Sequence, residues 1–364
     1  MTAVHQFVPA LLPRDATGDH TLALRGALRA QGWQSDIYVE AAHDELQHEA
    51  SYFEEYTRRS RPGDILVYQA STGSPVAQYL LHRPETLVLD YHNITPASFY
   101  APWEAHTAEK VTEARSQVAA LAPRAALGVA HSEFSASELA AFGCQTTVVV
   151  PILVSVGQWS KTPNPAAAAA LAARADGGTV LIFVGRLSPN KAQHQLVEAL
   201  WLYRRWYDPR ARLLLVGPSI TDGYADALVD LAAELGLSEA VIHGENLTSA
   251  ELAAWYGAAD VFVCLSDHEG FCIPLLEAMQ FGLPIVAFAA GAVPETVGPA
   301  GILLETKRPS LVAAAVDRIR SDTELAGSLV ALGRRRLRDF EADRTRNRFV
   351  EVLGALDRQE LCAR

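Results

Sequence analysis

Residues 260–288, DVFVCLSDHEGFCIPLLEAMQFGLPIVAF, read as a strand, a loop, a helix and a second strand. The apolar run at 261–265 predicts a buried strand, and Pro274 stands where a helix begins. Gly282 ends that helix before the apolar strand 285–288. A helix that joins two strands in this way predicts an α/β fold with a parallel sheet.

The same alternation of short apolar runs and amphipathic stretches continues on both sides of this unit. Two similar halves of this kind predict a pair of Rossmann-like domains. The strands expected in the first half are 3–8, 36–40, 65–69, 86–91, 126–130 and 146–150. The second half is expected to hold strands 179–184, 212–216, 241–243, 261–265 and 285–288, with helices 191–207, 225–235, 249–256 and 274–281.

The length of 364 residues suggests about two domains of ordinary size. Residues 151–178 form an alanine-rich stretch framed by proline and glycine, which suits a connector between them. We therefore expect an N-terminal Rossmann-like domain at 1–155 and a C-terminal one at 156–340. A helical tail at 341–364 follows, whose helices are candidates to cross back to the first domain.

Charge and hydropathy argue against nucleic-acid binding and against a membrane-spanning segment. The formal net charge of −11 argues against a nucleic acid, because phosphate backbones attract basic surfaces. No apolar run approaches the roughly 18 residues of a membrane span, and the N-terminus has no basic segment before an apolar one. We expect a cytoplasmic protein without a transmembrane segment, with a peripheral position at a membrane as the alternative.

Metal and disulfide motifs are absent from the sequence. No D-x-D, H-E-x-x-H or Cys/His cluster occurs, so no bound metal is expected. The four cysteines lie far apart in the chain and are expected to be reduced thiols. They are Cys144, Cys264, Cys272 and Cys362.

The loop after the strand 179–184 brings two cations to the start of a helix. Arg186 and Lys191 flank a turn in which Ser188 and Pro189 are expected to cap and open the helix. A guanidinium forks onto two oxygens and an ammonium is a mobile point charge, so the pair suits a diphosphate. The alternative is an ordinary surface arginine and lysine.

Two glutamates mark the loop and the helix after the strand 261–265. Glu269 lies in the loop, and Glu277 follows eight positions later, about one turn inside the helix. Carboxylates accept hydrogen bonds from vicinal hydroxyls, so one could hold a sugar and the other a ribose. Gly270 allows a ligand to approach the backbone. In the alternative, Glu277 caps or pairs locally and Glu269 is a solvated loop residue.

VGRLSPNK at 184–191 followed by HEGFCIPLLEAMQFGLPIVA at 268–287 resembles the retaining glycosyltransferases of family 4, which have the GT-B fold and an E-x7-E motif. The resemblance is strong over most of 179–305 and holds only in outline in the first half. It implies two Rossmann-like domains that face each other across a cleft.

The resemblance also implies roles for single residues. Arg186 and Lys191 match the pair that binds the donor diphosphate, Glu269 matches the glutamate on the donor-sugar hydroxyls, and Glu277 matches the one on the ribose. Backbone amides that reach the sugar or phosphate match Gly270, Phe271 and Cys272. Loops that contain Gly217 and Gly244 should flank the nucleobase.

Two segments of the first half resemble the family more loosely. His92, in LVLDYHNITPASFY, matches a histidine near the donor sugar and the reacting carbon, although a structural loop histidine is the alternative. Gly18 is the best match to a first-loop glycine that approaches the phosphates, where many relatives have two adjacent glycines. The aromatic residues Phe99, Tyr100 and Trp103 form either a wall for the acceptor or a core plug.

The implied activity is transfer of a sugar from a nucleotide diphosphate sugar, UDP- or GDP-linked, to an acceptor hydroxyl with retention of anomeric configuration. The donor is a co-substrate, and no separate cofactor is expected. The acceptor, expected on the N-terminal domain, is a sugar, a lipid-linked molecule or a small molecule. Alternatives are a nucleotide-sugar epimerase of similar architecture and a catalytically idle nucleotide-sugar-binding module. The sequence carries no signal for an oligomeric state.

Overall fold

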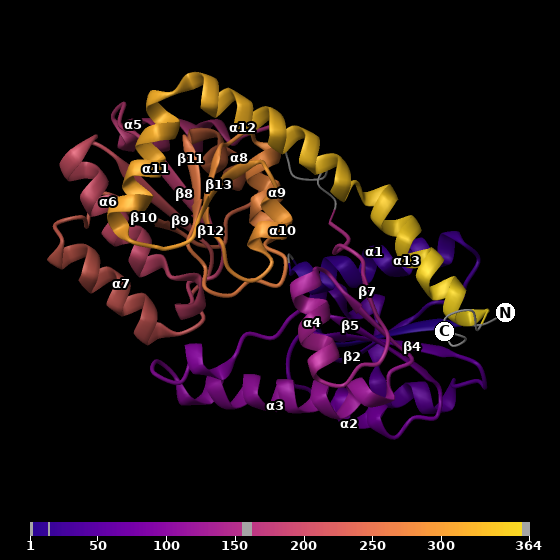
Figure 1. Cartoon of the computed structure of the whole chain (residues 1–364). Coiled ribbons are helices and arrows are strands. Elements are labelled where there is room, and N and C mark those ends of the chain that lie inside the picture. The colour runs from indigo at the N-terminus through magenta and orange to yellow at the C-terminus, as the bar shows by residue number, and fades with distance from the viewer. Residues whose placement is uncertain (1–2, 14, 155–161, 359–364) are drawn as a thin grey trace. The chain divides into compact units, whose positions relative to one another are not determined.

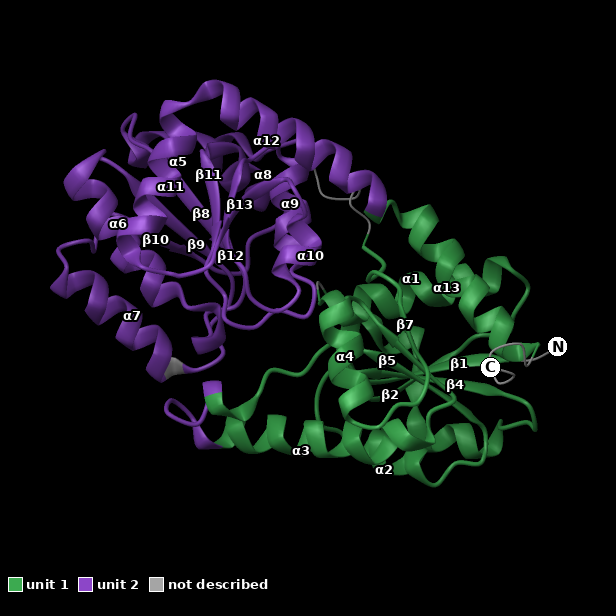
Figure 2. Cartoon of the chain, in the orientation of Figure 1, with its two compact units in different colours: residues 1–98, 106–154, 340–364 green, residues 99–105, 155–339 purple. Residues whose placement is uncertain are grey.

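The computed structural model describes residues 3–13, 15–154 and 162–358. The chain forms two compact units (Figure 2). Unit 1 comprises residues 1–98, 106–154 and 340–364, and unit 2 comprises residues 99–105 and 155–339. The domain boundary expected at 155/156 lies outside the described residues, as does Cys362.

Unit 1 is built on a seven-stranded sheet in the order β3-β2-β1-β4-β5-β6-β7, and every neighbouring pair is parallel (Figure 1). The chain reverses its direction of growth between β1 and β4, which is where ligands bind in open parallel sheets. The strands are β1 Val4–Leu11, β2 Ile37–Ala42, β3 Ser51–Tyr52, β4 Ile65–Ala70, β5 Thr86–Tyr91, β6 Leu127–Ala130 and β7 Thr147–Val149.

Helices α1 and α2 of unit 1 begin at side-chain caps. The Asp15 carboxylate accepts hydrogen bonds from the backbone of Thr17 and Gly18 at the start of α1, and Ser74 caps α2 ahead of Pro75. The α-helices are α1 Ala16–Ala30, α2 Pro75–Leu81, α3 Ala105–Leu121, α4 Glu133–Ala141 and α13 Ala342–Asp357. The 3-10 helices are η1 Asp44–Glu49, η2 Phe53–Arg58, η3 Ala97–Phe99 and η4 Ala122–Arg124.

The last helix, α13, returns to unit 1 and packs on α1 (Figure 2). Phe349 and Leu353 of α13 share a buried apolar cluster with Leu24 and Leu28 of α1. This burial fixes α13 on unit 1, so the expected crossing back is confirmed for this one helix, whereas α11 and α12 belong to unit 2.

Unit 2 is a six-stranded parallel sheet in the order β10-β9-β8-β11-β12-β13. Its reversal point lies between β8 and β11. The strands are β8 Val180–Val184, β9 Arg212–Val216, β10 Val241–Gly244, β11 Val261–Cys264, β12 Ile285–Phe288 and β13 Gly301–Leu304. The helices are α5 Pro165–Ala175, η5 Pro189–Lys191, α6 Gln193–Trp206, α7 Asp222–Glu234, α8 Ser249–Ala258, α9 Ile273–Gln280, α10 Val293–Val297, α11 Pro309–Ser321, α12 Thr323–Arg336 and η6 Leu337–Phe340. Among the described residues, no helix has the length and apolarity needed to cross a membrane.

One expected helix start is wrong. The sequence predicted a helix from residue 191 with Ser188 as its cap, whereas α6 begins at Gln193. Residues Pro189–Lys191 form the separate turn η5, and Ala192 has a left-handed backbone with φ 54° that breaks the continuity. Lys191 therefore precedes the helix, and the Ser188 side chain makes no capping hydrogen bond.

Candidate functional site

The loop between β11 and α9 carries the first glutamate of the predicted motif. Glu269 is 7% exposed, and its carbonyl accepts a hydrogen bond from the Ala292 amide at 2.9 Å. Gly291 has φ 55°, and a Cβ there would lie 2.5 Å from the Glu269 carbonyl oxygen. Only glycine permits this approach, so the loop after β12 fixes the position of Glu269. The sequence reasoning did not single out Gly291.

Lys191 and Glu269 form an ion pair at the carboxyl edge of the unit 2 sheet. The Lys191 Nζ lies 2.7 Å from the Glu269 Oε2. Burial has the largest single effect and would lower the pKa of Lys191, but the groups around it, with the Glu269 carboxylate first among them, raise the pKa overall. The Asp267 amide donates to the Asn190 carbonyl at 2.8 Å, which ties the two loops together. The structure thus joins the loops after β8 and β11 through a charged pair.

Arg186 is exposed, and within the described part of the chain it has no ion-pair partner. Its charge lowers the pKa of Lys191, so the two cations act on the same region. Its backbone is held firmly: a Cβ on Gly217 would lie 2.4 Å from the Gly185 carbonyl oxygen, and Leu187 donates to the Pro218 carbonyl at 2.8 Å. A guanidinium on a fixed backbone is well suited to an anionic ligand.

Glu277 lies half-buried on α9 and is held by a tyrosine of α8. The Tyr256 hydroxyl donates to the Glu277 Oε2 at 2.6 Å, and the Tyr256 ring stacks on Phe281 at 4.8 Å. Burial raises the pKa of Glu277 to about 7, although the Tyr256 hydrogen bond opposes the rise. Tyr256 is a positioning residue that the sequence reasoning missed, because it lies on another helix, 21 residues before Glu277, and shares no pattern with the motif.

Substitution Glu277→Gln is expected to change how stability depends on pH. The native state binds the Glu277 proton more tightly than the unfolded chain, so wild-type stability from this group is full below about pH 4.5 and is lost as pH rises through about 7. The glutamine variant has no such proton. As pH rises from 4.5 to 7, the wild type should therefore lose free energy of unfolding that the variant keeps. The difference amounts to at most about 3 kcal/mol, and partial exposure of the side chain reduces it.

Urea denaturation of both proteins at pH 5 and pH 8 measures this difference. Tyr256→Phe is the matched control, because it removes the hydrogen bond that lowers the pKa and should move the transition to higher pH. Parallel pH profiles for wild type and Glu277→Gln would show that the pKa of Glu277 is not raised in the folded protein.

The backbone at the start of α9 is strained. Cys272, the residue before the helix, has φ 68°, a region that costs a non-glycine residue about 1 kcal/mol or more. Its side chain does not cap the helix, and Pro274 follows in the first turn. The Thr296 hydroxyl donates to the Phe271 carbonyl at 2.5 Å. The Phe271 and Cys272 side chains are buried, so only the backbone of this segment is suited to contact a ligand.

The cysteines that the structure describes, Cys144, Cys264 and Cys272, are free thiols. A hydrogen bond with Cys264, together with burial, raises the pKa of Cys272 well above its ordinary value. Cys272 is therefore a protonated, buried thiol. This agrees with the expectation of reduced cysteines for these three residues.

Gly217 follows β9, and Gly244 is the last residue of the neighbouring strand β10. The Gly217 amide donates to the Gly244 carbonyl at 2.9 Å, and a Cβ on Gly244 would lie 2.7 Å from the Trp255 ring. Both glycines thus permit close packing at the same edge of the sheet as Arg186. Their predicted place beside the nucleobase stays a prediction.

His92 and Gly18 lie in unit 1, each at the carboxyl edge of that sheet. The His92 Nε2 lies 2.6 Å from the Gln69 Oε1, and burial lowers the pKa of His92 well below its ordinary value. The Gly18 amide donates to the Asp15 carboxylate at 3.1 Å, and a Cβ there would lie 2.7 Å from the Leu12 carbonyl oxygen. Gly18 therefore serves the cap and the close packing of α1.

The aromatic segment 99–105 belongs to unit 2, although it leads directly into α3 of unit 1. The Tyr100 side chain is 5% exposed, and the Ser188 Oγ lies 3.4 Å from its hydroxyl. The Trp103 ring meets the Tyr224 ring edge to face at 5.0 Å. For Tyr100 the structure favours the core plug over the acceptor wall.

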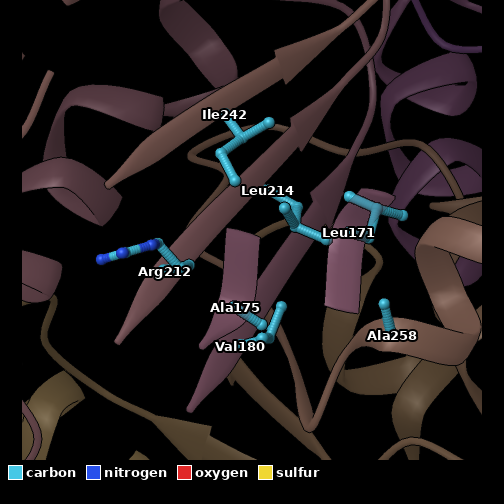
Figure 3. Close-up of a pocket in the computed structure, with 7 residues that line it drawn as sticks. All are labelled: Leu171, Ala175, Val180, Arg212, Leu214, Ile242 and Ala258. Atoms are coloured by element: carbon cyan, nitrogen blue, oxygen red, sulfur yellow. The ribbon is translucent and has the colours of Figure 1, made fainter. Parts of the chain in front are cut away.

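A small hollow in unit 2 lies at the other end of the sheet, where β8 and β9 begin (Figure 3). It has no interior room for a water molecule, so it is a packing defect and not a ligand site. Its lining residues are Leu171, Ala175, Val180, Arg212, Leu214, Ile242 and Ala258.

The sequence of unit 2 is similar to that of known glycosyltransferases. Residues 171–336 match the model of a family described as "Glycosyl transferases group 1". The D-inositol 3-phosphate glycosyltransferase of Salinispora arenicola is 34% identical over 184 residues, which cover 49% of this chain and 41% of that protein. A GDP-mannose-dependent alpha-(1-6)-phosphatidylinositol monomannoside mannosyltransferase of Mycolicibacterium smegmatis is 33% identical over 204 residues, covering 53% and 52%. The chain spans about half the length of the curated relatives it matches.

Solved structures match both units. HepE of Anabaena, in complex with UDP and glucose, superposes with a TM-score of 0.74 at 19% identity and covers 98% of this chain and 100% of that one. Sucrose-phosphate synthase of Thermosynechococcus elongatus gives 0.76 at 20% identity and covers 100% of both. The chain has a two-domain, Rossmann-like GT-B fold, which confirms the predicted fold class.

Proposed function

We propose that this protein is a glycosyltransferase that moves a sugar from a nucleotide diphosphate donor, bound in unit 2, to an acceptor hydroxyl. The observation that carries the proposal is the Lys191–Glu269 pair beside Arg186, at the carboxyl edge of the unit that matches the group 1 glycosyltransferase model. In this proposal the two cations bind the diphosphate of the donor, and the carboxylate binds its sugar.

The chemical step breaks the bond between the anomeric carbon and the diphosphate oxygen. Arg186 and Lys191 stabilise the negative charge that develops on the departing diphosphate, and such prearranged charges contribute most where the charge grows in the transition state. Glu269 accepts hydrogen bonds from sugar hydroxyls, and Glu277 accepts them from the ribose. These groups take the place of a metal ion at the diphosphate.

Retention of configuration follows from the resemblance to family 4. In this proposal the acceptor oxygen bonds to the anomeric carbon from the face that the diphosphate leaves. The acceptor proton passes to an oxygen of the departing diphosphate. The products are the glycosylated acceptor and a protonated nucleoside diphosphate, so atoms and charge balance.

The donor in this proposal is UDP- or GDP-linked. HepE is described in complex with UDP and UDP-glucose, and the Mycolicibacterium relative is named for GDP-mannose. The acceptor class follows the same comparison: a sugar, a lipid-linked molecule or a small molecule. An epimerase would convert the donor without any acceptor, and an idle binding module would bind it unchanged.

A panel of UDP- and GDP-sugars incubated with the protein, analysed by mass spectrometry, tests the proposal. We expect slow hydrolysis of one donor to its nucleoside diphosphate and free sugar, because water replaces a missing acceptor. Candidate acceptors should then convert hydrolysis into transfer. A new isomer of the donor would favour the epimerase, and binding without turnover would favour the idle module.

A further inference from the structure

Four side chains of unit 1 converge at the carboxyl end of its sheet. His20 comes from α1, Asp90 from the end of β5, His92 from the residue after β5, and His131 from the residue after β6. One nitrogen or oxygen atom of each lies within 4.8 Å of the corresponding atom of every other. His20 and Asp90 are fully buried, and His131 is 4% exposed.

The hydrogen bonds around His131 and His92 fix their protons on the outer side of the cluster. The His131 Nδ1 lies 3.0 Å from the Val150 carbonyl oxygen, which only accepts, so Nδ1 carries the proton. The His92 Nε2 lies 2.6 Å from the Gln69 Oε1, also an acceptor, so Nε2 carries the proton. In each neutral ring the other nitrogen, His131 Nε2 or His92 Nδ1, presents a lone pair.

The Asp90 carboxylate is held in the same way. The Leu153 amide donates to the His20 Nδ1 at 3.0 Å, so the His20 proton is on Nε2. That Nε2 lies 2.9 Å from the Asp90 Oδ2. Both nitrogens of His20 are thus engaged, and the second carboxylate oxygen, Asp90 Oδ1, has no hydrogen-bond partner.

Two buried acceptor atoms are left facing each other. Asp90 Oδ1 and His131 Nε2 lie 3.5 Å apart, and neither has a hydrogen-bond partner. A proton shared between them would bring them to about 2.7–2.9 Å. A cation ~2.1 Å from both atoms would subtend about 113° between them, near the ~109° of tetrahedral coordination. The spacing fits a metal ion better than a hydrogen bond.

We propose that unit 1 binds one divalent transition-metal ion of the zinc class through His92 Nδ1, His131 Nε2 and Asp90 Oδ1. Neutral imidazoles and a carboxylate are ligands that such ions take, and three protein ligands leave a fourth position for water. Every ligand has its outer atom held by a hydrogen bond, which is the support that metal-binding histidines need.

The supporting hydrogen bonds extend beyond the ligands. The Gln69 Nε2 donates to the Gln6 Oε1 at 3.0 Å, and the Gln6 Nε2 donates to the Thr21 carbonyl at 2.9 Å, so Gln69 cannot turn its amide group toward His92. The sequence motifs predicted no metal because the ligands come from separate segments around residues 90–92 and 131, which no short spacing connects.

Metal binding by the whole 364-residue chain tests the proposal. The protein is stripped with a chelator and titrated with Co²⁺, followed by competition with Zn²⁺ and metal analysis. We expect one ion per chain and the intense visible spectrum of tetrahedral Co²⁺, displaced by Zn²⁺. His131→Gln should weaken binding at least 100-fold, and His20→Gln, which removes support only, should weaken it about 10- to 100-fold.

The matched control is His82→Gln, an exposed histidine of the same unit, which should bind as the wild type does. Circular dichroism checks that each variant is folded. If His131→Gln fails to fold, the wild-type stoichiometry and cobalt spectrum decide the question. Wild-type protein that binds no ion, or that gives a weak octahedral spectrum unchanged in folded His131→Gln, would overturn the proposal. The readout is metal binding, so the result is independent of the proposed sugar transfer.

Discussion

Replacing Glu269 by alanine is expected to lower the turnover of sugar transfer by about 100-fold or more, while affinity for the free nucleotide changes little. The carboxylate is assigned to the donor-sugar hydroxyls, and its loss removes contacts that orient the reacting sugar. The nucleotide keeps Arg186 and Glu277. Donor turnover from the mass-spectrometric assay and nucleotide affinity from calorimetry measure the two effects separately.

Two further variants separate charge from position. Glu269→Gln keeps the size of the side chain and one acceptor oxygen but removes the charge that pairs with Lys191. Glu234→Ala removes an exposed carboxylate from α7 of the same unit and should leave turnover unchanged. Wild-type turnover in Glu269→Ala would remove Glu269 from the reaction and leave it only as the partner of Lys191.

Lys191→Ala is expected to damage both folding and donor binding. Glu269 is 7% exposed and would lose the ammonium 2.7 Å away, and an unpaired buried charge typically costs about 3–5 kcal/mol of stability. Loss of a charged hydrogen bond to the diphosphate, worth about 1.5–3 kcal/mol, should weaken donor affinity roughly 10- to 100-fold. Turnover should fall as well, because the same charge stabilises the leaving group.

A double-mutant cycle separates these two losses. The variant Lys191→Ala/Glu269→Ala should recover much of the stability, because no unpaired charge remains, yet it should stay inactive. Arg186→Ala is the matched cation control: the side chain is exposed, so its loss should spare stability but weaken donor binding. Equal stability of Lys191→Ala and wild type would show that the Lys191–Glu269 pair is not formed in solution.

Apolar periodicity predicted most of the fold because the central strands form continuous buried runs, as β4 and β11 do. Strands 86–91, 212–216 and 285–288 have the predicted bounds. The short elements β3 Ser51–Tyr52 and α10 Val293–Val297 were missed, since two and five residues are too few to show a period. The start of α6 was wrong because the left-handed backbone of Ala192 has no sequence signal.

The candidate site was predictable where chemistry lies within one loop or helix. Two short sequence motifs contain the predicted residues Arg186, Lys191, Glu269 and Glu277. The structure brings Lys191 and Glu269 into contact. The supporting residue Tyr256 reaches the site only through tertiary packing. The cluster of His20, Asp90 and His131 depends on which strand ends are neighbours, which a single sequence does not encode locally.

Because α13 packs on unit 1, the folding of unit 1 cannot be completed until α13 has been synthesised. Leu24 and Leu28 leave the ribosome long before Phe349 and Leu353, the residues that cover them. On the order of 200 residues separate β7 from α13, so at about 5–20 residues per second translation leaves that apolar surface open for about 10–40 s. During this interval residues 155–339 of unit 2 are made, so the first half of the nascent protein offers a binding surface to chaperones until α13 is synthesised.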